Sequence, residues 1–142
     1  MMNRELLHQS ELVRYYLEPD NRLLYCYWFA CEHPAEALFR RDIEQLCALI
    51  VAHRPQAVLD NSLEVDYPIG PLLQTWIADR IHAAMLAGGA TKYALISPQD
   101  LIAELSNEQT FSEIEALQDG QAPWQQAEFH SEEEARAWLG LG

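Results

Sequence analysis

The alternation of apolar and polar residues predicts a β-hairpin near the start of the chain. In residues 11–17, Val13, Tyr15 and Leu17 fall on one side of an extended chain, as in a half-buried strand. Residues 23–30 form a second strand that is dense in aromatic side chains. Between the two strands, residues 19–22 read Pro-Asp-Asn-Arg, and this composition favours a turn because Pro fixes φ while Asp and Asn tolerate tight geometry.

Residues 1–10 carry a weaker pattern, which fits a leader, a short helix or an extra edge strand.

After the hairpin, apolar residues recur at helical spacing. One helix is predicted to begin at Pro34 and to end before Pro55, with its charged residues, Asp42 among them, in solvent. A second helix is predicted from about Pro68 to Leu86, with Gly88 and Gly89 as its stop. Its apolar stripe consists of Ile69, Leu72, Leu73, Trp76, Ile77, Ile81, Ala84 and Met85. Short apolar strands are expected at residues 57–59 and 92–96.

Serine residues followed by acidic residues or glutamine predict the remaining helix starts. Ser97 is the expected N-cap of a third helix, and a second capping pattern at Ser106 leaves open whether residues 101–118 form one helix or two. Residues 119–123 are expected to form a loop and residues 125–130 a weak strand. Ser131 then caps the last helix.

The resulting order, β-β-α-β-α-β-α-β-α, predicts one α/β domain. Its mixed sheet combines an N-terminal antiparallel hairpin with parallel βαβ units, and helices flank the sheet. The chain has 142 residues, of which 49% are hydrophobic and 22% charged, and this is the size and composition of one globular domain. We expect that domain to span residues 11–142.

Charge narrows the range of partners. Nine Lys and Arg residues stand against 22 Asp and Glu residues, so the formal net charge is −13. This balance opposes binding to nucleic acid and to anionic membrane surfaces. Three cysteines without CxxC spacing and scattered histidines predict no disulfide framework, no metal site and no cofactor. The N-terminus lacks a signal-peptide pattern, so a cytoplasmic protein is expected.

The best candidate for a working face is the polar loop that follows the apolar strand at residues 57–59. Parallel α/β folds present functional groups at the carboxyl ends of their strands. The residues predicted to form a protein-contact loop are Asp60, Asn61, Ser62, Glu64, Asp66 and Tyr67.

The Asp60-Asn61-Ser62 turn and the tail Phe129-x-Ser131-x-x-x-Ala135-x-x-Trp138-Leu139 resemble the small bacterial STAS-like proteins, whose fold is that of anti-sigma-factor antagonists. The resemblance covers about residues 11–139. In that family a serine between the comparable strand and helix is phosphorylated by a partner kinase, which implies Ser62 as the phosphosite. The family has Asp-Ser-Ser-Gly directly at the helix start, whereas residues 63–68 intervene here.

Three functions follow as hypotheses. The first is a non-enzymatic, regulatory module that binds another protein or, through its aromatic strand, a second copy of itself. The second is a carrier or sensor of a small apolar ligand, with a pocket between the sheet and the helices. The third is a carboxylate-based hydrolase, which requires Asp60, Asp66 and Asp100 to converge.

Overall fold

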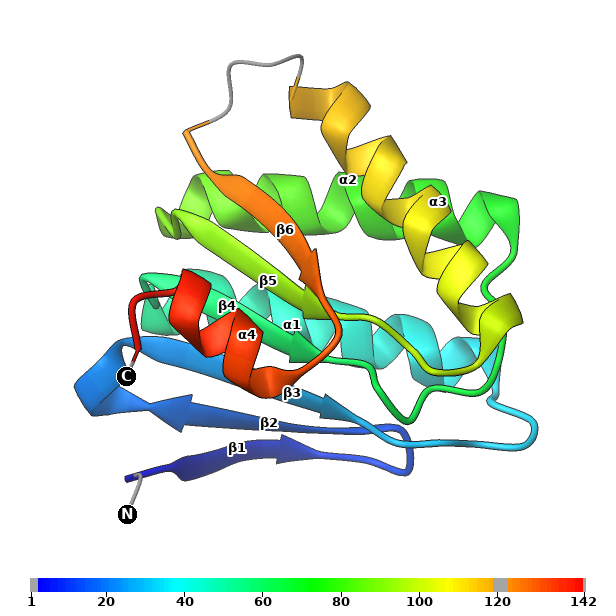
Figure 1. The fold of residues 1–142 in the computed structure, drawn as a ribbon, viewed down its shortest axis with the longest axis horizontal. Coiled ribbons are helices and arrows are strands. Elements are labelled where there is room, and N and C mark those ends of the chain that lie inside the picture. The colour runs from blue at the N-terminus through cyan, green and yellow to red at the C-terminus, as the bar shows by residue number, and fades with distance from the viewer. Residues whose placement is uncertain (1–2, 119–122, 142) are drawn as a thin grey trace.

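The computed structural model describes residues 3–118 and 123–141, which form a six-stranded sheet in the order β1-β2-β3-β4-β5-β6 (Figure 1). Neighbouring strands are antiparallel from β1 to β3 and parallel from β3 to β6. This confirms the predicted α/β class and mixed sheet, and residues 5–9 form the extra edge strand. The strands are β1 (Glu5–Gln9), β2 (Val13–Glu18), β3 (Leu23–Trp28), β4 (Ala57–Asn61), β5 (Lys92–Ile96) and β6 (Gln125–Phe129).

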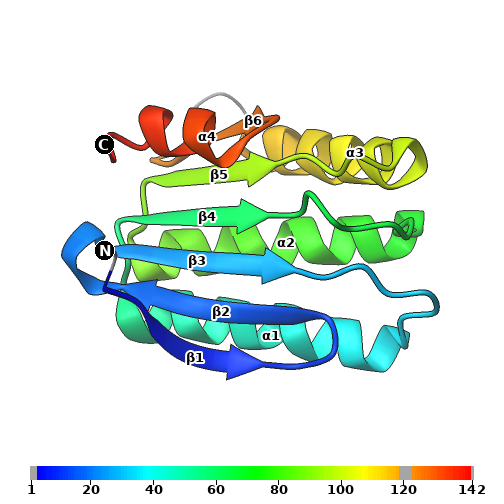
Figure 2. The same cartoon turned by 60° about the horizontal axis from the view of Figure 1, so that its bottom comes forward.

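Helices cover the two faces of the sheet unequally. The three long helices α1 (Glu36–His53), α2 (Pro71–Gly88) and α3 (Leu101–Gln118) lie on one face, and the short α4 (Glu132–Trp138) lies on the other (Figures 1 and 2). Each crossover from β3 to β6 leads to the next strand in the same direction. Because such crossovers share one hand, their helices all fall on the same face.

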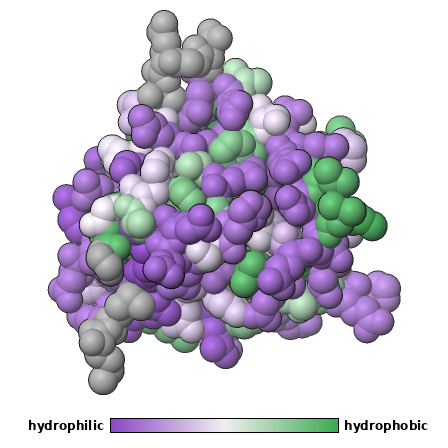
Figure 3. All heavy atoms as spheres, in the orientation of Figure 1, coloured by the Kyte–Doolittle hydropathy of each residue, from purple (hydrophilic) through white to green (hydrophobic). Residues whose placement is uncertain are grey.

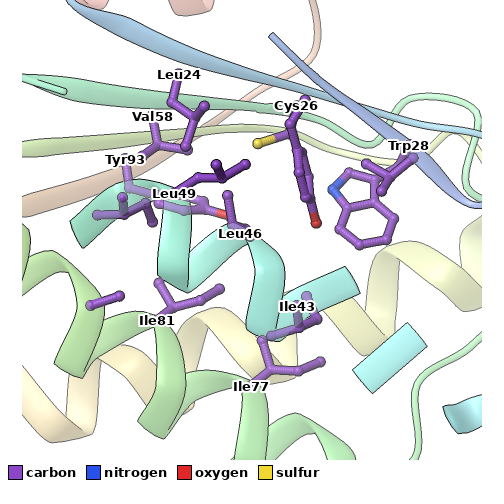
Figure 4. Packing of buried hydrophobic residues seen from close by; sticks show 14 of the residues in the cluster. Leu24, Cys26, Trp28, Ile43, Leu46, Leu49, Val58, Ile77, Ile81 and Tyr93 are labelled. Carbon is purple, nitrogen blue, oxygen red and sulfur yellow. The ribbon is translucent and has the colours of Figure 1, made fainter. Parts of the chain in front are cut away.

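Alternate side chains of the strands enter two separate apolar clusters. Leu24, Cys26 and Trp28 extend from β3 toward α1 and α2 (Figure 4), in the larger cluster. Leu23 and Tyr25 belong to the smaller cluster beneath α4. The aromatic strand is therefore buried mainly as core.

Two helices begin later than their prolines predicted. Ala35 is extended, with ψ of 127°, and is the N-cap of α1, so Pro34 precedes the helix. Gly70 is likewise extended, with ψ of 160°, and caps α2, so Pro71 rather than Pro68 is its first residue. In both cases a proline is compatible with the extended segment before the helix as well as with the first turn.

Residues 101–118 form one continuous helix, and its cap differs from the prediction. Asp100 Oδ1 accepts the backbone N–H of Ala103 at 2.9 Å, while the Ser97 hydroxyl donates to Glu128. The predicted cap, Ser97, is instead bound to β6, and the Asp100 side chain caps the helix. Ser131 does cap α4, accepting the N–H of Glu134. The predicted loop at 119–123 falls mostly outside the described residues.

Two side chains contradict the predicted burial. Asp42, expected in solvent, is fully buried and accepts hydrogen bonds from the Ser10 hydroxyl and from the ring of His8. Leu72, expected in the apolar stripe of α2, is 87% exposed. The first turn of α2 extends beyond the strand ends (Figure 2), so that the sheet cannot cover it.

Candidate functional site

A largely apolar cavity of about 70 Å³ lies at the carboxyl ends of the parallel strands. The sheet, α1, α2, α3 and the loop at residues 62–70 all contribute to its wall. That loop is the segment which the sequence singled out. The lining side chains are Trp28, Phe39, Ile43, Asp60, Ser62, Val65, Tyr67, Ile69, Ile77, Ile81, Tyr93, Leu95, Asn107, Thr110, Phe111, Ile114 and Gln126.

The loop turns its apolar side chains inward. Val65 and Tyr67 are only 5% and 6% exposed, whereas Glu64 and Asp66, each directly before one of them, face outward. The outer side chains are nevertheless bound: Asp66 Oδ1 accepts the backbone N–H of Cys31 at 2.9 Å, and Glu64 accepts the hydroxyl of Tyr27. The predicted contact loop is therefore fastened to the end of β3 and forms a wall of the cavity.

Asp60 places a carboxyl group in this apolar wall. It accepts the Tyr93 hydroxyl at 2.6 Å on one oxygen and the Ser62 hydroxyl at 2.8 Å on the other. Burial raises the pKa of Asp60 above its ordinary 3.8, and the two hydrogen bonds oppose that rise. Asp60 is half-buried, and its side chain lines the cavity.

Tyr67 carries an unsatisfied hydroxyl. Its oxygen is buried without a hydrogen-bond partner, which holds for no other buried side-chain nitrogen or oxygen among the described residues. Burial raises the pKa of the Tyr67 hydroxyl well above 10, so the group stays neutral. Buried polar groups are normally paired, so this hydroxyl of a cavity-lining residue is an exception, although its oxygen is itself closed off from the cavity.

The remaining loop candidates point elsewhere or are enclosed. Asn61 lies on the opposite face of the sheet, where its amide donates to the Tyr25 hydroxyl at 3.0 Å. Ser62 is 5% exposed and its hydroxyl donates to Asp60. A kinase would reach Ser62 only after the loop had opened.

The three aspartates of the hydrolase hypothesis do not share a partner. Asp60 binds two hydroxyls, Asp66 binds the backbone of Cys31, and Asp100 caps α3. In the described ranges, no group of three His, Cys, Asp or Glu side chains is placed to hold a metal ion.

Part of the cavity wall had no signal in the sequence. The face of α3 that includes Thr110 and Ile114, together with Gln126 of β6, reaches the site only through the crossover that follows β5. The inward turn of Val65 and Tyr67 did have a signal, since apolar and acidic residues alternate over residues 63–67.

Beside the cavity, α3 begins with exposed apolar side chains, which we call the α3 patch. Leu101, Ile102 and Leu105 are 70%, 63% and 51% exposed. Apolar residues gather at the right-hand edge of the space-filling view, where α3 begins (Figure 3). Exposed apolar groups of this kind are typical of contact surfaces.

Comparisons with protein-family models, curated proteins and solved structures found no match for this chain. Within residues 3–118 and 123–141, helices are too short or too polar to cross a membrane.

Proposed function

We propose that this protein is a small-molecule binding module with a STAS-like fold, which is the second of the three functions expected from its sequence, and that it does not transform its ligand. The observation that carries the proposal is the cavity at the strand ends, whose apolar wall includes the carboxyl-bearing side chain of Asp60 and the side chain of Tyr67. Mostly apolar pockets with a few polar groups are the usual form of a ligand site.

The identity of residue 67 supports a ligand rather than simple packing. Phenylalanine would fill the same space without an unpaired hydroxyl, whose burial costs about 1–3 kcal/mol. Tyr15 shows the ordinary solution, because its buried hydroxyl donates to the backbone carbonyl of Asp42 at 2.7 Å. A ligand that pairs with Tyr67 would account for the difference.

Binding without catalysis fits the partners of Asp60. Its oxygens accept hydroxyl groups of Tyr93 and Ser62, and no histidine is among the described residues that line the cavity. A serine activated for attack requires a base oriented by a third group. Here Ser62 donates a hydrogen bond to Asp60, which also accepts one from Tyr93.

The test is native mass spectrometry of freshly purified protein, which detects any small molecule that co-purifies. That molecule is then added back in an NMR titration that follows the backbone amide resonances. We expect shifted resonances in β4, the loop and α3. Ile114→Phe should narrow the cavity and weaken binding about tenfold or more. Leu117→Phe is the matched control, because Leu117 lies on the same helix but is 42% exposed.

Equal binding by the Ile114 and Leu117 variants would contradict this location of the site. A protein that carries no ligand, and whose cavity resonances respond to none of a set of small organic molecules, would contradict the function itself.

The α3 patch favours a second candidate function, the binding of a protein partner. Its exposed apolar residues stand on a chain with a net charge of −13, so a fitting partner has apolar anchors and basic neighbours; a second copy of the chain is the alternative. Replacing Ile102 and Leu105 by serine should abolish cross-linking to a partner or sedimentation as a dimer. Leu86→Ser, at an exposed site on α2, should change neither.

A further inference from the structure

The cavity contains one kind of charge. Among the described residues that line it, Asp60 is acidic and none is Lys, Arg or His. Asp60 also takes part in none of the ion pairs found in the described part of the chain. Buried charges in proteins are normally paired, and an unpaired buried carboxyl group either keeps its proton or binds a cation.

The carboxylate of Asp60 has acceptor positions left with which to bind a cation. Each carboxylate oxygen can accept two hydrogen bonds, and here each accepts one, from Tyr93 or from Ser62. Both donors are neutral hydroxyls, so they orient the carboxylate without neutralising it.

Aromatic rings line the same cavity as this acidic group. Trp28 and Phe39 have ring centroids 5.5 Å apart, and Phe39 meets Tyr67 edge to face at 6.3 Å. Tyr93 and Phe111 also line the cavity. The faces of such rings attract cations through their quadrupoles, most strongly where water is excluded.

We propose that the ligand is a small organic cation, a primary amine with a compact apolar body, whose ammonium group binds the carboxylate of Asp60 inside this aromatic wall. The inference rests on the proposed binding function and names its ligand class. The net charge of −13 supports it by attracting cations to the protein and repelling carboxylates and phosphates.

The cavity limits the size of the amine. Its volume of about 70 Å³ is roughly half that of the engineered cavity of about 150 Å³ that accommodates benzene. In that proportion the cavity holds a body of about three carbons, so a body of about four carbons is the upper limit without movement of α3.

The test is an NMR titration near neutral pH with three molecules of one shape: isobutylamine, isobutyl alcohol and isobutyrate. We expect the amine to bind at least about tenfold more tightly than the alcohol, because a charged hydrogen bond is stronger than a neutral one. Isobutyrate should not bind. Asp60→Asn should reduce the affinity for the amine to that for the alcohol.

Asp79→Asn is the matched control, since it removes the same charge from the exposed side of α2, away from the cavity lining, and should leave the amine preference intact. Should Asp60→Asn fail to fold, the native protein still decides. Its affinity for the amine must rise with pH as Asp60 ionises, while its affinity for the alcohol stays constant.

The outcomes separate the two proposals. Equal affinity for amine and alcohol, or tighter binding of isobutyrate, would overturn the cation and leave a ligand-binding cavity. Failure of all three molecules to bind would also overturn the proposal of a cationic ligand. If the native mass spectrum is empty as well, the proposed binding function is overturned too.

Discussion

Two buried tyrosines differ in what their hydroxyl groups meet, and this difference yields a prediction. Tyr67→Phe removes an unpaired hydroxyl and should raise the free energy of unfolding by about 1 kcal/mol. Tyr15→Phe removes a hydroxyl that donates to the backbone of α1 and should lower that free energy by about the same amount. Urea denaturation of both variants measures the contrast. A loss of stability in the Tyr67 variant would mean that its hydroxyl is paired in solution.

Asp60 gives a second prediction at the same scale. Its pKa is raised in the folded protein, so the folded state holds this proton to higher pH than the unfolded state does. The associated stability is fully present below pH 3.8 and is lost as pH rises through the folded pKa. Each unit of difference between the two pKa values corresponds to about 1.4 kcal/mol.

Asp60→Asn removes this titration. Relative to the native protein, the variant should therefore gain stability from about pH 4 upward and level off once Asp60 has ionised. Urea unfolding at a series of pH values tests this. A constant difference between the two proteins over that range would contradict a raised pKa.

Among the helices, the close contact between α1 and α2 depends on a glycine. A Cβ at Gly88 would lie 2.7 Å from the carbonyl oxygen of Ile50 and 2.9 Å from its Cγ2. Gly88→Ala should therefore lower the free energy of unfolding by about 1–3 kcal/mol, although alanine favours a helix. Gly70→Ala, where a Cβ meets nothing within 4 Å, should change it by less than about 0.5 kcal/mol.

Thermal unfolding of the two glycine variants provides the measurement. If both melt alike, the helices separate at little cost and the contact does not fix their packing.

Across the whole molecule, Glu18 joins the two ends of the chain. Glu18 lies at the end of β2 and is 1% exposed. Its carboxylate accepts hydrogen bonds from the guanidinium groups of Arg4 at 2.7 Å and of Arg136, in α4, at 2.8 Å. Burial alone would raise the pKa of Glu18, but hydrogen bonds from Arg136, Asn21 and Arg4 outweigh it and lower the pKa from 4.5 to about 2. The network therefore stabilises α4 and β1 together.

Glu18→Gln should lower the free energy of unfolding by about 2 kcal/mol near neutral pH, between the values for exposed and buried ion pairs. Because the pKa of Glu18 is depressed, this difference is present above pH 4.5 and disappears as pH falls through about 2. Glu44→Gln, which breaks an exposed pair with Arg80 at 3.5 Å, should cost less than about 0.5 kcal/mol. Similar losses in both variants would show that burial of Glu18 adds nothing.

The elements of the fold were predictable because their signals are local. Apolar spacing of two or of three to four residues marked the strands and helices, and Ser131 was recognised as a cap from its neighbours alone. Errors arose where a distant segment decided the outcome. Ser97 binds Glu128 instead of capping α3, and Asp42 is buried because β1 and its turn supply His8 and Ser10 as partners.

The sequence proposed a working face at the residues that follow the apolar strand at 57–59, because strand ends in α/β folds present loops there. Asp60 and Tyr67 were both expected in that loop, whereas the structure places Asp60 in β4 and both side chains on the wall of one cavity. The cavity is completed by β5 and α3, which follow much later in the chain. They therefore decide which side chains of the loop turn inward.

The amino-acid sequence by itself determined the α/β class, the parallel units and the acidic charge, since these follow from local periodicity and composition. Only the tertiary structure decided that the side chains of Asp60 and Tyr67 line one apolar cavity. Burial and the presence or absence of a hydrogen-bond partner depend on residues distant in the chain, and the properties on which the proposed binding site rests arise from them.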